Sequence, residues 1–174
     1  KGFCLFNNVA VGAAHARALG FSRVAIVDYD VHHGNGTQHI LEEDPTVFYF
    51  STHQYPHYPG TGSIHEIGLA PGMGATLNAP MEAGAGDDDY LKTFDERFMP
   101  AMERFKPEFI IISAGFDAHE DDPLSATRVT ETGFAEMTRR ALAIAQTHAG
   151  GRLISVLEGG YDLNGLSHSV EAHL

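Results

Sequence analysis

The sequence predicts an α/β fold with a mainly parallel sheet, and two patterns along the chain support this prediction. Short apolar runs rich in β-branched residues recur four times, each bounded by polar or glycine-rich segments, as strands are. Longer segments with helical spacing alternate with these runs. Because the runs are apolar on both faces, they fit strands that helices cover on both sides, which is typical of a parallel sheet.

The predicted elements follow one another in a regular order. The predicted strands cover residues 24–27, 47–50, 109–112 and 153–157. The predicted helices end at glycine or before proline, and they cover residues 9–19, 88–105 and 130–148. The segment 53–86 is rich in Gly, Pro and polar residues, and we interpret it as a functional loop system in which residues 75–79 form a further strand.

Composition and charge narrow the functional classes. The chain has 174 residues, of which 43% are hydrophobic, so we expect residues 1–174 to form a single domain around one core. A net charge of −12 argues against direct binding of nucleic acid, which needs clustered Lys and Arg, and is compatible with a cationic ligand. No apolar stretch approaches the ~18–20 residues that span a bilayer, so we expect no membrane partner.

The single cysteine bears on the cellular compartment. Cys4 lies in an apolar run with Phe3, Leu5 and Phe6, and the usual burial of cysteine predicts an inert, buried thiol. A chain with one cysteine has no disulfide framework, so a reducing cytoplasm fits it best.

Acidic residues and histidines follow the predicted strands, at the edge of an open α/β sheet where ligands bind. Asp28, Asp30 and His32 are spaced by two, which directs their side chains to one side of an extended chain. Asp117 follows a separate strand and supplies a further carboxylate. One histidine and two aspartates with an open coordination position are typical of catalytic zinc. The alternative is that the aspartates cap the following turn and that His32 is an ordinary polar residue.

Four motifs in a fixed order favour the metal site. They are DYDVHHGNGT at residues 28–37, PGTG at 59–62, SAGFDA at 113–118 and LEGGY at 157–161. In this order they resemble the histone deacetylase superfamily, particularly its class II and bacterial deacetylase-like members and the acetylpolyamine amidohydrolases. The resemblance runs from Gly2 to beyond Tyr161. It implies an arginase/deacetylase-like three-layer fold and zinc-dependent hydrolysis of an N-acetyl amide.

The resemblance also implies roles for single residues around the metal. Asp30, His32 and Asp117 would be the zinc ligands, and Asp28 would orient a catalytic histidine through a hydrogen bond. Asn35 would partner the other histidine of the family's pair, as asparagine does in class II-like members. The family's buried potassium site would correspond to Asp28, Asp30, His32, Ser51 and Thr52.

Further roles concern the substrate. Tyr161 would donate its hydroxyl to the acetamide oxygen as negative charge develops there, and Gly159 and Gly160 would present it in a tight turn. Phe3 and Tyr58 would line a narrow acyl-lysine channel, where two ring faces enclose an aliphatic stem. The alternatives are that Tyr161 is an ordinary packed tyrosine after a turn and that Phe3 belongs to the core.

The chain departs from the family pattern in two ways. The family's general base is a pair of adjacent histidines upstream of the Gly-Phe-Cys segment, and this sequence begins at Lys1. We therefore expect a domain truncated at its N-terminus, which binds zinc but hydrolyses acetamides poorly. His33 does not replace the missing base, because it alternates away from His32 on an extended chain. Asp121 stands where many family members carry glycine.

Two functions remain open on the sequence alone. The first is an enzyme that acts on an acetylated amine, either acetyl-lysine in proteins or an acetylpolyamine. The second is a non-catalytic module that keeps the deacetylase fold and its metal for binding. A homo-oligomer is a further expectation, because a truncated parallel sheet exposes an edge strand that tends to pair.

Overall fold

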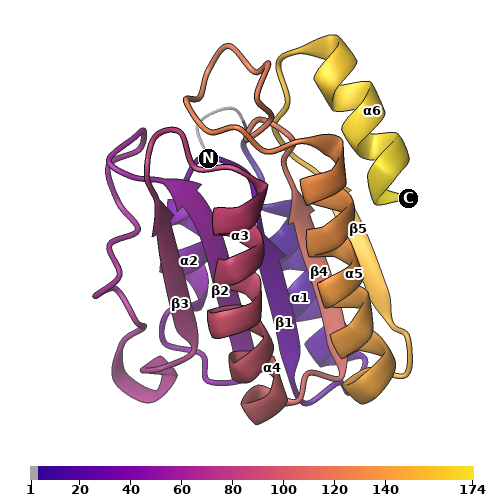
Figure 1. Ribbon diagram of the computed structural model, residues 1–174. Coiled ribbons are helices and arrows are strands. Elements are labelled where there is room, and N and C mark those ends of the chain that lie inside the picture. The colour runs from indigo at the N-terminus through magenta and orange to yellow at the C-terminus, as the bar shows by residue number, and fades with distance from the viewer. Residues whose placement is uncertain (1–3) are drawn as a thin grey trace.

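The computed structural model describes residues 4–174, and it confirms the predicted α/β fold (Figure 1). In these residues five strands form one sheet in the order β3-β2-β1-β4-β5, and every neighbouring pair is parallel. The strands are β1 Val24–Asp28, β2 Val47–Gln54, β3 Thr76–Met81, β4 Phe109–Ala114 and β5 Leu153–Leu157. Every predicted run overlaps one of them, including residues 75–79, which overlap β3.

Six α-helices of the described chain complete the fold. They are α1 Asn8–Ala18, α2 Asn35–Leu41, α3 Asp87–Thr93, α4 Met99–Phe105, α5 Glu131–His148 and α6 Leu163–His173. The predicted helix 88–105 changes its winding, because a π-helical turn, Phe94–Phe98, joins α3 to α4. The sequence prediction does not include α2 or α6. The first is only seven residues long, and the second contains Gly165, which lowers helix propensity.

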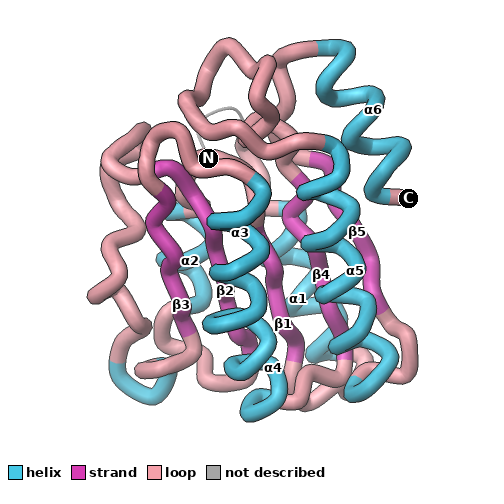
Figure 2. Tube along the Cα trace, in the orientation of Figure 1, coloured by secondary structure: helices cyan, strands magenta, loops and turns pink. Residues whose placement is uncertain are grey.

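Helices cover both faces of the sheet, so the fold has three layers (Figures 1 and 2). Helices α3, α4 and α5 lie on the front face, and α1 and α2 lie behind it. The described chain has two hydrophobic cores, and alternate residues of β1 pack into each of them. Ala25 and Val27 belong to the larger core, whereas Val24 and Ile26 belong to the smaller core against α1. Every residue of β1 is therefore buried, which explains why its sequence shows no polar face.

All five strands end at one edge of the sheet, which carries the loops at the top of Figure 1. The register of β1 with its two neighbours places Asp28 beside Ser51 of β2 and Ser113 of β4. The segments that follow β1 and β4 consequently begin side by side. The predicted metal site requires that Asp30, His32 and Asp117 lie at this edge of the sheet, and the adjacent ends of β1 and β4 allow it.

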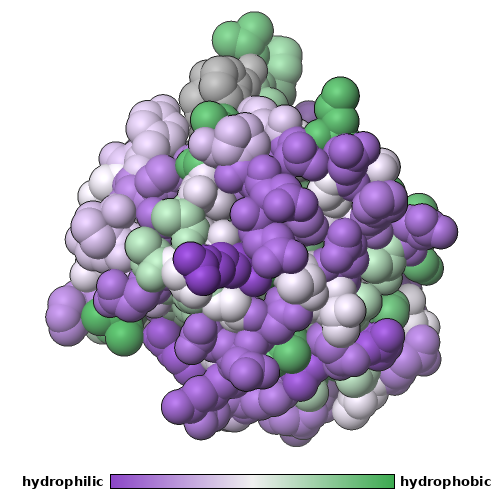
Figure 3. Space-filling view, turned by 45° about the horizontal axis from the view of Figure 1, so that its top comes forward, coloured by the Kyte–Doolittle hydropathy of each residue, from purple (hydrophilic) through white to green (hydrophobic). Residues whose placement is uncertain are grey.

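The surface carries few features of an apolar interface in the view of Figure 3. Seen from the front and above, it is mainly hydrophilic, and its hydrophobic residues are scattered. No helix within residues 4–174 combines the length and the apolar character needed to cross a membrane.

The prediction that Cys4 is buried is wrong. Cys4 is exposed, and its apolar neighbours Leu5 and Phe6 are exposed as well. This run precedes α1, which is capped by Asn7, and its side chains belong to neither core. An apolar run thus predicts burial only where a strand or helix carries it into the layers. Phe3, which was predicted to line the channel, lies outside the described residues.

The starts of α3 and α5 are joined by Asp87. Its carboxylate accepts hydrogen bonds from the backbone N–H and the hydroxyl of Thr130, the N-cap of α5, at 2.8 and 2.6 Å. We expect Asp87→Ala to lower the free energy of unfolding by about 1–3 kcal/mol, because both charge-assisted bonds are lost. Urea denaturation followed by circular dichroism measures this change. Asp88→Ala, at the exposed neighbouring position, is the matched control, and an equal loss in both variants would contradict the role given to Asp87.

Candidate metal centre

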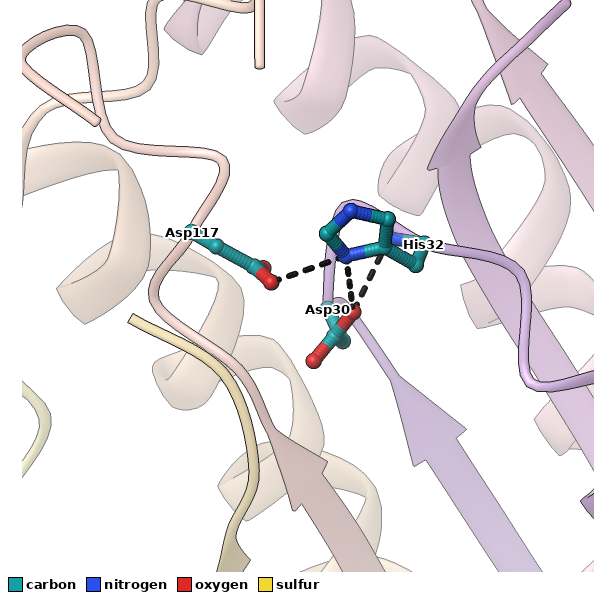
Figure 4. Close-up of side chains that lie close together, drawn as sticks. All are labelled: Asp30, His32 and Asp117. Atoms are coloured by element: carbon teal, nitrogen blue, oxygen red, sulfur yellow. Dashed lines mark hydrogen bonds and ion pairs between the residues drawn. The ribbon is translucent and has the colours of Figure 1, made fainter. Parts of the chain in front are cut away.

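The three side chains predicted to bind metal converge beyond the ends of β1 and β4 (Figure 4). His32 Nδ1 lies 3.2 Å from Asp30 Oδ1 and 3.0 Å from Asp117 Oδ2. One ligand atom from each residue lies within 4.8 Å of the other two, and no other set of three such side chains in residues 4–174 meets this condition. The side chains of Asp30 and Asp117 are only 2% and 0% exposed, so the centre is enclosed on its protein side.

Backbone hydrogen bonds orient the two carboxylates. The N–H of Val31 donates to Asp117 Oδ1 at 2.8 Å, which leaves the second oxygen of Asp117 directed at His32. The N–H of His32 donates to Asp30 Oδ1 at 2.9 Å, and the N–H of Gly159 donates to Asp30 Oδ2 at 3.0 Å. The N–H groups of Val31 and His32, in the segment after β1, therefore help to orient both carboxylates. Asp28, which the spacing of two predicted to point into the same cavity, lies outside the three-residue set.

The electrostatics of the centre favour a positive charge beside its two carboxylates. Burial raises the pKa of Asp117, and the negative charge of Asp30 raises it further. Burial alone would lower the pKa of His32, but its hydrogen bonds to Asp117 and Asp30 outweigh burial and raise this pKa to about 9. Without a metal ion, the protonated imidazole of His32 thus balances the charge of the two buried carboxylates. One imidazole nitrogen and two carboxylates form a donor set that fits a divalent ion such as zinc.

Two glycines let the backbone approach the carboxylates closely. A Cβ atom at Gly159 would lie 2.1 Å from Asp117 Oδ2 and 2.8 Å from Asp30 Oδ2. A Cβ atom at Gly115 would lie 2.4 Å from Asp30 Oδ2. Any side chain at either position would therefore displace a predicted metal ligand. The sequence prediction assigned Gly159 to the channel but did not anticipate this contact.

A cavity of about 470 Å³ opens above the centre. Asp30, His32 and Gly159 line it, together with Tyr58 and Tyr161 among the predicted substrate residues. The ring of His57 stacks on that of His32 with their centroids 5.2 Å apart, and Tyr58 meets the ring of His32 edge-on at 6.2 Å. Gly160 does not line this cavity; it turns the chain with φ near 143° beside Leu166.

The remaining predicted residues occupy the surroundings of the centre. Asp28 is buried, and its Oδ2 accepts a hydrogen bond from the hydroxyl of Tyr49 at 2.9 Å. Asn35 is exposed at the start of α2 and lies outside the three-residue set. Ser51 and Thr52 are buried in β2, and Thr52 Oγ1 has no hydrogen-bond partner among the described residues.

A polar network around His33 was not predicted. His33 faces away from the metal set, and its Nδ1 and Nε2 lie 2.7 Å from Thr61 Oγ1 and 2.9 Å from Gln38 Oε1. Gln38 Nε2 donates to Glu66 Oε2 at 2.7 Å, and Asn78 Nδ2 donates to Gln38 Oε1 at 2.7 Å. The network fixes the loop after β2, which carries His57 and Tyr58. Except for the pair His33 and Gln38, the hydrogen-bonded residues of this network are separated by 28 to 40 positions in the sequence. No local pattern therefore predicts these contacts.

Glu66 gives this network a dependence on pH. Burial would raise the pKa of Glu66, but hydrogen bonds from Gln38 and from the backbone of Ser63 and Gly62 lower it below its ordinary value of 4.5. Its contribution to stability is therefore present above about pH 4.5 and is lost as the pH falls through the lowered pKa. We expect Glu66→Gln to cost about 1–2 kcal/mol of unfolding free energy at pH 7 and less in acid. Urea denaturation between acid pH and pH 7 measures this loss of unfolding free energy, and Glu43→Gln, at an exposed position, is the matched control. A loss in Glu66→Gln that does not change with pH would contradict the role given to the charge of Glu66.

Comparison with known proteins identifies the family. The family model described as the histone deacetylase domain matches residues 1–174. The chain belongs to the histone deacetylase family. A probable deacetylase of Archaeoglobus fulgidus is 49% identical over 164 residues, which are 94% of this chain and 46% of the relative. The polyamine deacetylase HDAC10 of Homo sapiens is 42% identical over 177 residues, which cover 98% of this chain and 26% of the relative.

Solved structures of histone deacetylases agree with this assignment. The HDA15 HD domain superposes with a TM-score of 0.95 at 45% identity, and the match covers 99% of this chain and 49% of that chain. The histone deacetylase Clr3 superposes with a TM-score of 0.89 at 40% identity, over 97% of this chain and 29% of that chain. The arginase/deacetylase-like fold is therefore confirmed. The chain spans less than half the length of these relatives.

Proposed function

We propose that the chain carries the zinc centre of an amidohydrolase that removes the acetyl group from an acetylated amine. The observation that supports this function best is the convergence of Asp30, His32 and Asp117 beside a cavity that Asp30, His32 and Tyr161 line. The donor set fits zinc, and it leaves one side open to the cavity, as a catalytic site requires. Membership of the histone deacetylase family supports the same reaction class.

The chemistry divides between the ion and the chain. A zinc ion held by the three residues supplies a Lewis acid that polarises an amide carbonyl and increases the acidity of water. The chain's own part is to stabilise the negative charge that develops on the acetamide oxygen, and Tyr161 donates its hydroxyl to that oxygen. Asp28 and Asn35 support the histidines that serve as acid and base in the family, which gives them an orienting role.

Substrate binding follows from the lining of the cavity. Tyr58 packs against the aliphatic stem next to the acetamide, and the backbone of Gly159 shapes the channel wall. The net charge of −12 favours an amine-bearing substrate. Acetyl-lysine in proteins and acetylpolyamines both fit this description. One relative of the chain is named as a polyamine deacetylase.

Other parts of the proposal concern a second ion and the surroundings of the protein. Potassium would lie beside zinc, at a site built from Asp28, Asp30, His32, Ser51 and Thr52. The buried hydroxyl of Thr52, which has no hydrogen-bond partner among the described residues, is available as a ligand for such an ion.

The proposed compartment is the cytoplasm, whereas two plant relatives are named as chloroplastic. Pairing of two copies through β5, an edge strand of the described sheet, is the proposed route to a homo-oligomer.

Ligand binding tests the proposed function without requiring turnover. The zinc-loaded chain is titrated calorimetrically with acetohydroxamic acid, and N-acetyl-lysine amide is then added as a competitor. We expect zinc-dependent binding that the acetylated competitor displaces and that lysine amide does not. Equal binding to the metal-free chain, or equal competition by lysine amide, would contradict an acetamide site.

A further inference from the structure

Asp122 is a buried carboxylate outside the metal set that joins two loops of the cavity rim. Its Oδ1 accepts a hydrogen bond from the N–H of Leu124 at 2.9 Å, which is an ordinary turn contact. Its Oδ2 accepts one from the N–H of Tyr161 at 2.8 Å, and a longer one from Asp162 at 3.4 Å. The residue is only 5% exposed, so these bonds replace its lost hydration. Asp122 thus links the loop after β4 to the loop after β5.

The same turn also reaches the third loop of the rim. His57 Nε2 donates to the backbone oxygen of Leu124 at 3.1 Å. His57, Leu124 and Tyr161 all line the cavity above the metal set. The three loops that follow β2, β4 and β5 are therefore connected through the segment that Asp122 stabilises.

The hydrogen bond from the Tyr161 N–H to Asp122 joins segments that are distant in the sequence. It spans 39 residues of sequence, so local turn formation does not require it. Tyr161 stands between the flexible Gly159-Gly160 pair and the start of α6, whose N-cap is Asp162. A charge-assisted bond to its backbone N–H fixes the direction in which the tyrosine side chain leaves the chain.

We propose that Asp122 is a positioning residue that holds Tyr161 over the metal centre. The proposal rests on the proposed function, in which the Tyr161 hydroxyl meets the acetamide oxygen. Asp122 acts through the backbone of Tyr161 and touches neither substrate nor metal. Removing its charge should loosen Tyr161 while leaving the three metal ligands in place.

Amide hydrogen exchange measures this hold directly. In Asp122→Asn we expect exchange at the Tyr161 amide to accelerate about tenfold or more, as the loss of a charge-assisted bond implies. The matched control is Asp121→Asn, the same change at the exposed neighbouring position, which should leave this amide unchanged. Asp122→Ser is the second variant, because serine preserves the turn to Leu124 but is too short to reach Tyr161. Unchanged exchange at Tyr161 in both Asp122 variants would overturn the proposal.

Binding of acetohydroxamic acid to the zinc-loaded chain shows whether Asp122 acts through Tyr161. We expect Tyr161→Phe and Asp122→Asn each to weaken binding about tenfold, and the double variant to be no weaker than Tyr161→Phe alone. Full additivity in the double variant would overturn the positioning role. Faster exchange at Tyr161 together with normal binding by Tyr161→Phe would refute the proposed role of the tyrosine hydroxyl and would support the hold of Asp122 on the loop.

Discussion

A chain carrying Asp117→Asn is expected to fold normally and to contain almost no zinc, whereas the unaltered chain is expected to bind one zinc ion. Asparagine keeps an oxygen for the Val31 N–H, which now donates to Asp117 Oδ1 at 2.8 Å. It removes the negative charge that faces His32. Loss of an outer partner of a metal ligand already weakens binding about 10–100-fold, so loss of a ligand should cost on the order of a thousandfold.

The comparison with alanine separates metal binding from folding. Asp117→Ala should lose zinc as well, but it also leaves the buried Val31 N–H without its acceptor, which costs about 1–3 kcal/mol of stability. Without metal, Asp117→Asn should be at least as stable as the unaltered chain, because it relieves repulsion between two buried carboxylates. Zinc content is measured by atomic emission after dialysis against a weak chelator. Equal zinc content in the unaltered and altered chains would remove Asp117 from the ligand set.

Gly159→Ala is expected to disturb the centre more severely, although it adds only a methyl group. The new Cβ would lie 2.1 Å from Asp117 Oδ2 and 2.8 Å from Asp30 Oδ2, so both carboxylates would have to move. Gly159 is also held by two bonds, since its N–H donates to Asp30 and its oxygen accepts from Phe116. We expect a loss of about 3 kcal/mol or more in unfolding free energy, together with loss of zinc.

Gly12→Ala provides the control for the added methyl group. Gly12 lies inside α1, and a Cβ there would meet only Ile111 Cδ1, at 3.3 Å, a side-chain methyl that can yield. Alanine has the higher helix propensity, so this variant should be neutral or up to about 1 kcal/mol more stable. Thermal denaturation with and without zinc measures both variants. Normal stability and zinc content in Gly159→Ala would show that the backbone can retreat from the carboxylates.

The strands and the proximity of Asp30 to His32 were predictable because their signals are local. An apolar run with no polar face predicts a buried strand, and the spacing of Asp30 and His32 places both side chains in one cavity. Placing Asp117 with them required strand topology or a family resemblance, since its contact with His32 spans 85 residues.

The features that the prediction omits depend on contacts between distant segments. Nothing near Asp122 in sequence indicates Tyr161, and nothing near Glu66 indicates Gln38. The exposure of Cys4 shows the same limit from the other direction. Its apolar neighbours suggest burial, but burial depends on which layer covers a segment, and residue types alone do not fix that.

The closure of Gly159 over the carboxylates couples ion binding to the outer part of the sheet. The glycine follows β5, an edge strand, and two backbone bonds hold it against the loops after β1 and β4. Local unfolding of β5 would therefore break the two backbone hydrogen bonds of Gly159 and release the ion. By mass action, zinc should then protect β5 and α6 from proteases in proportion to its free concentration. The ion would thus stabilise β5 and α6 against local unfolding, in addition to its part in the proposed reaction.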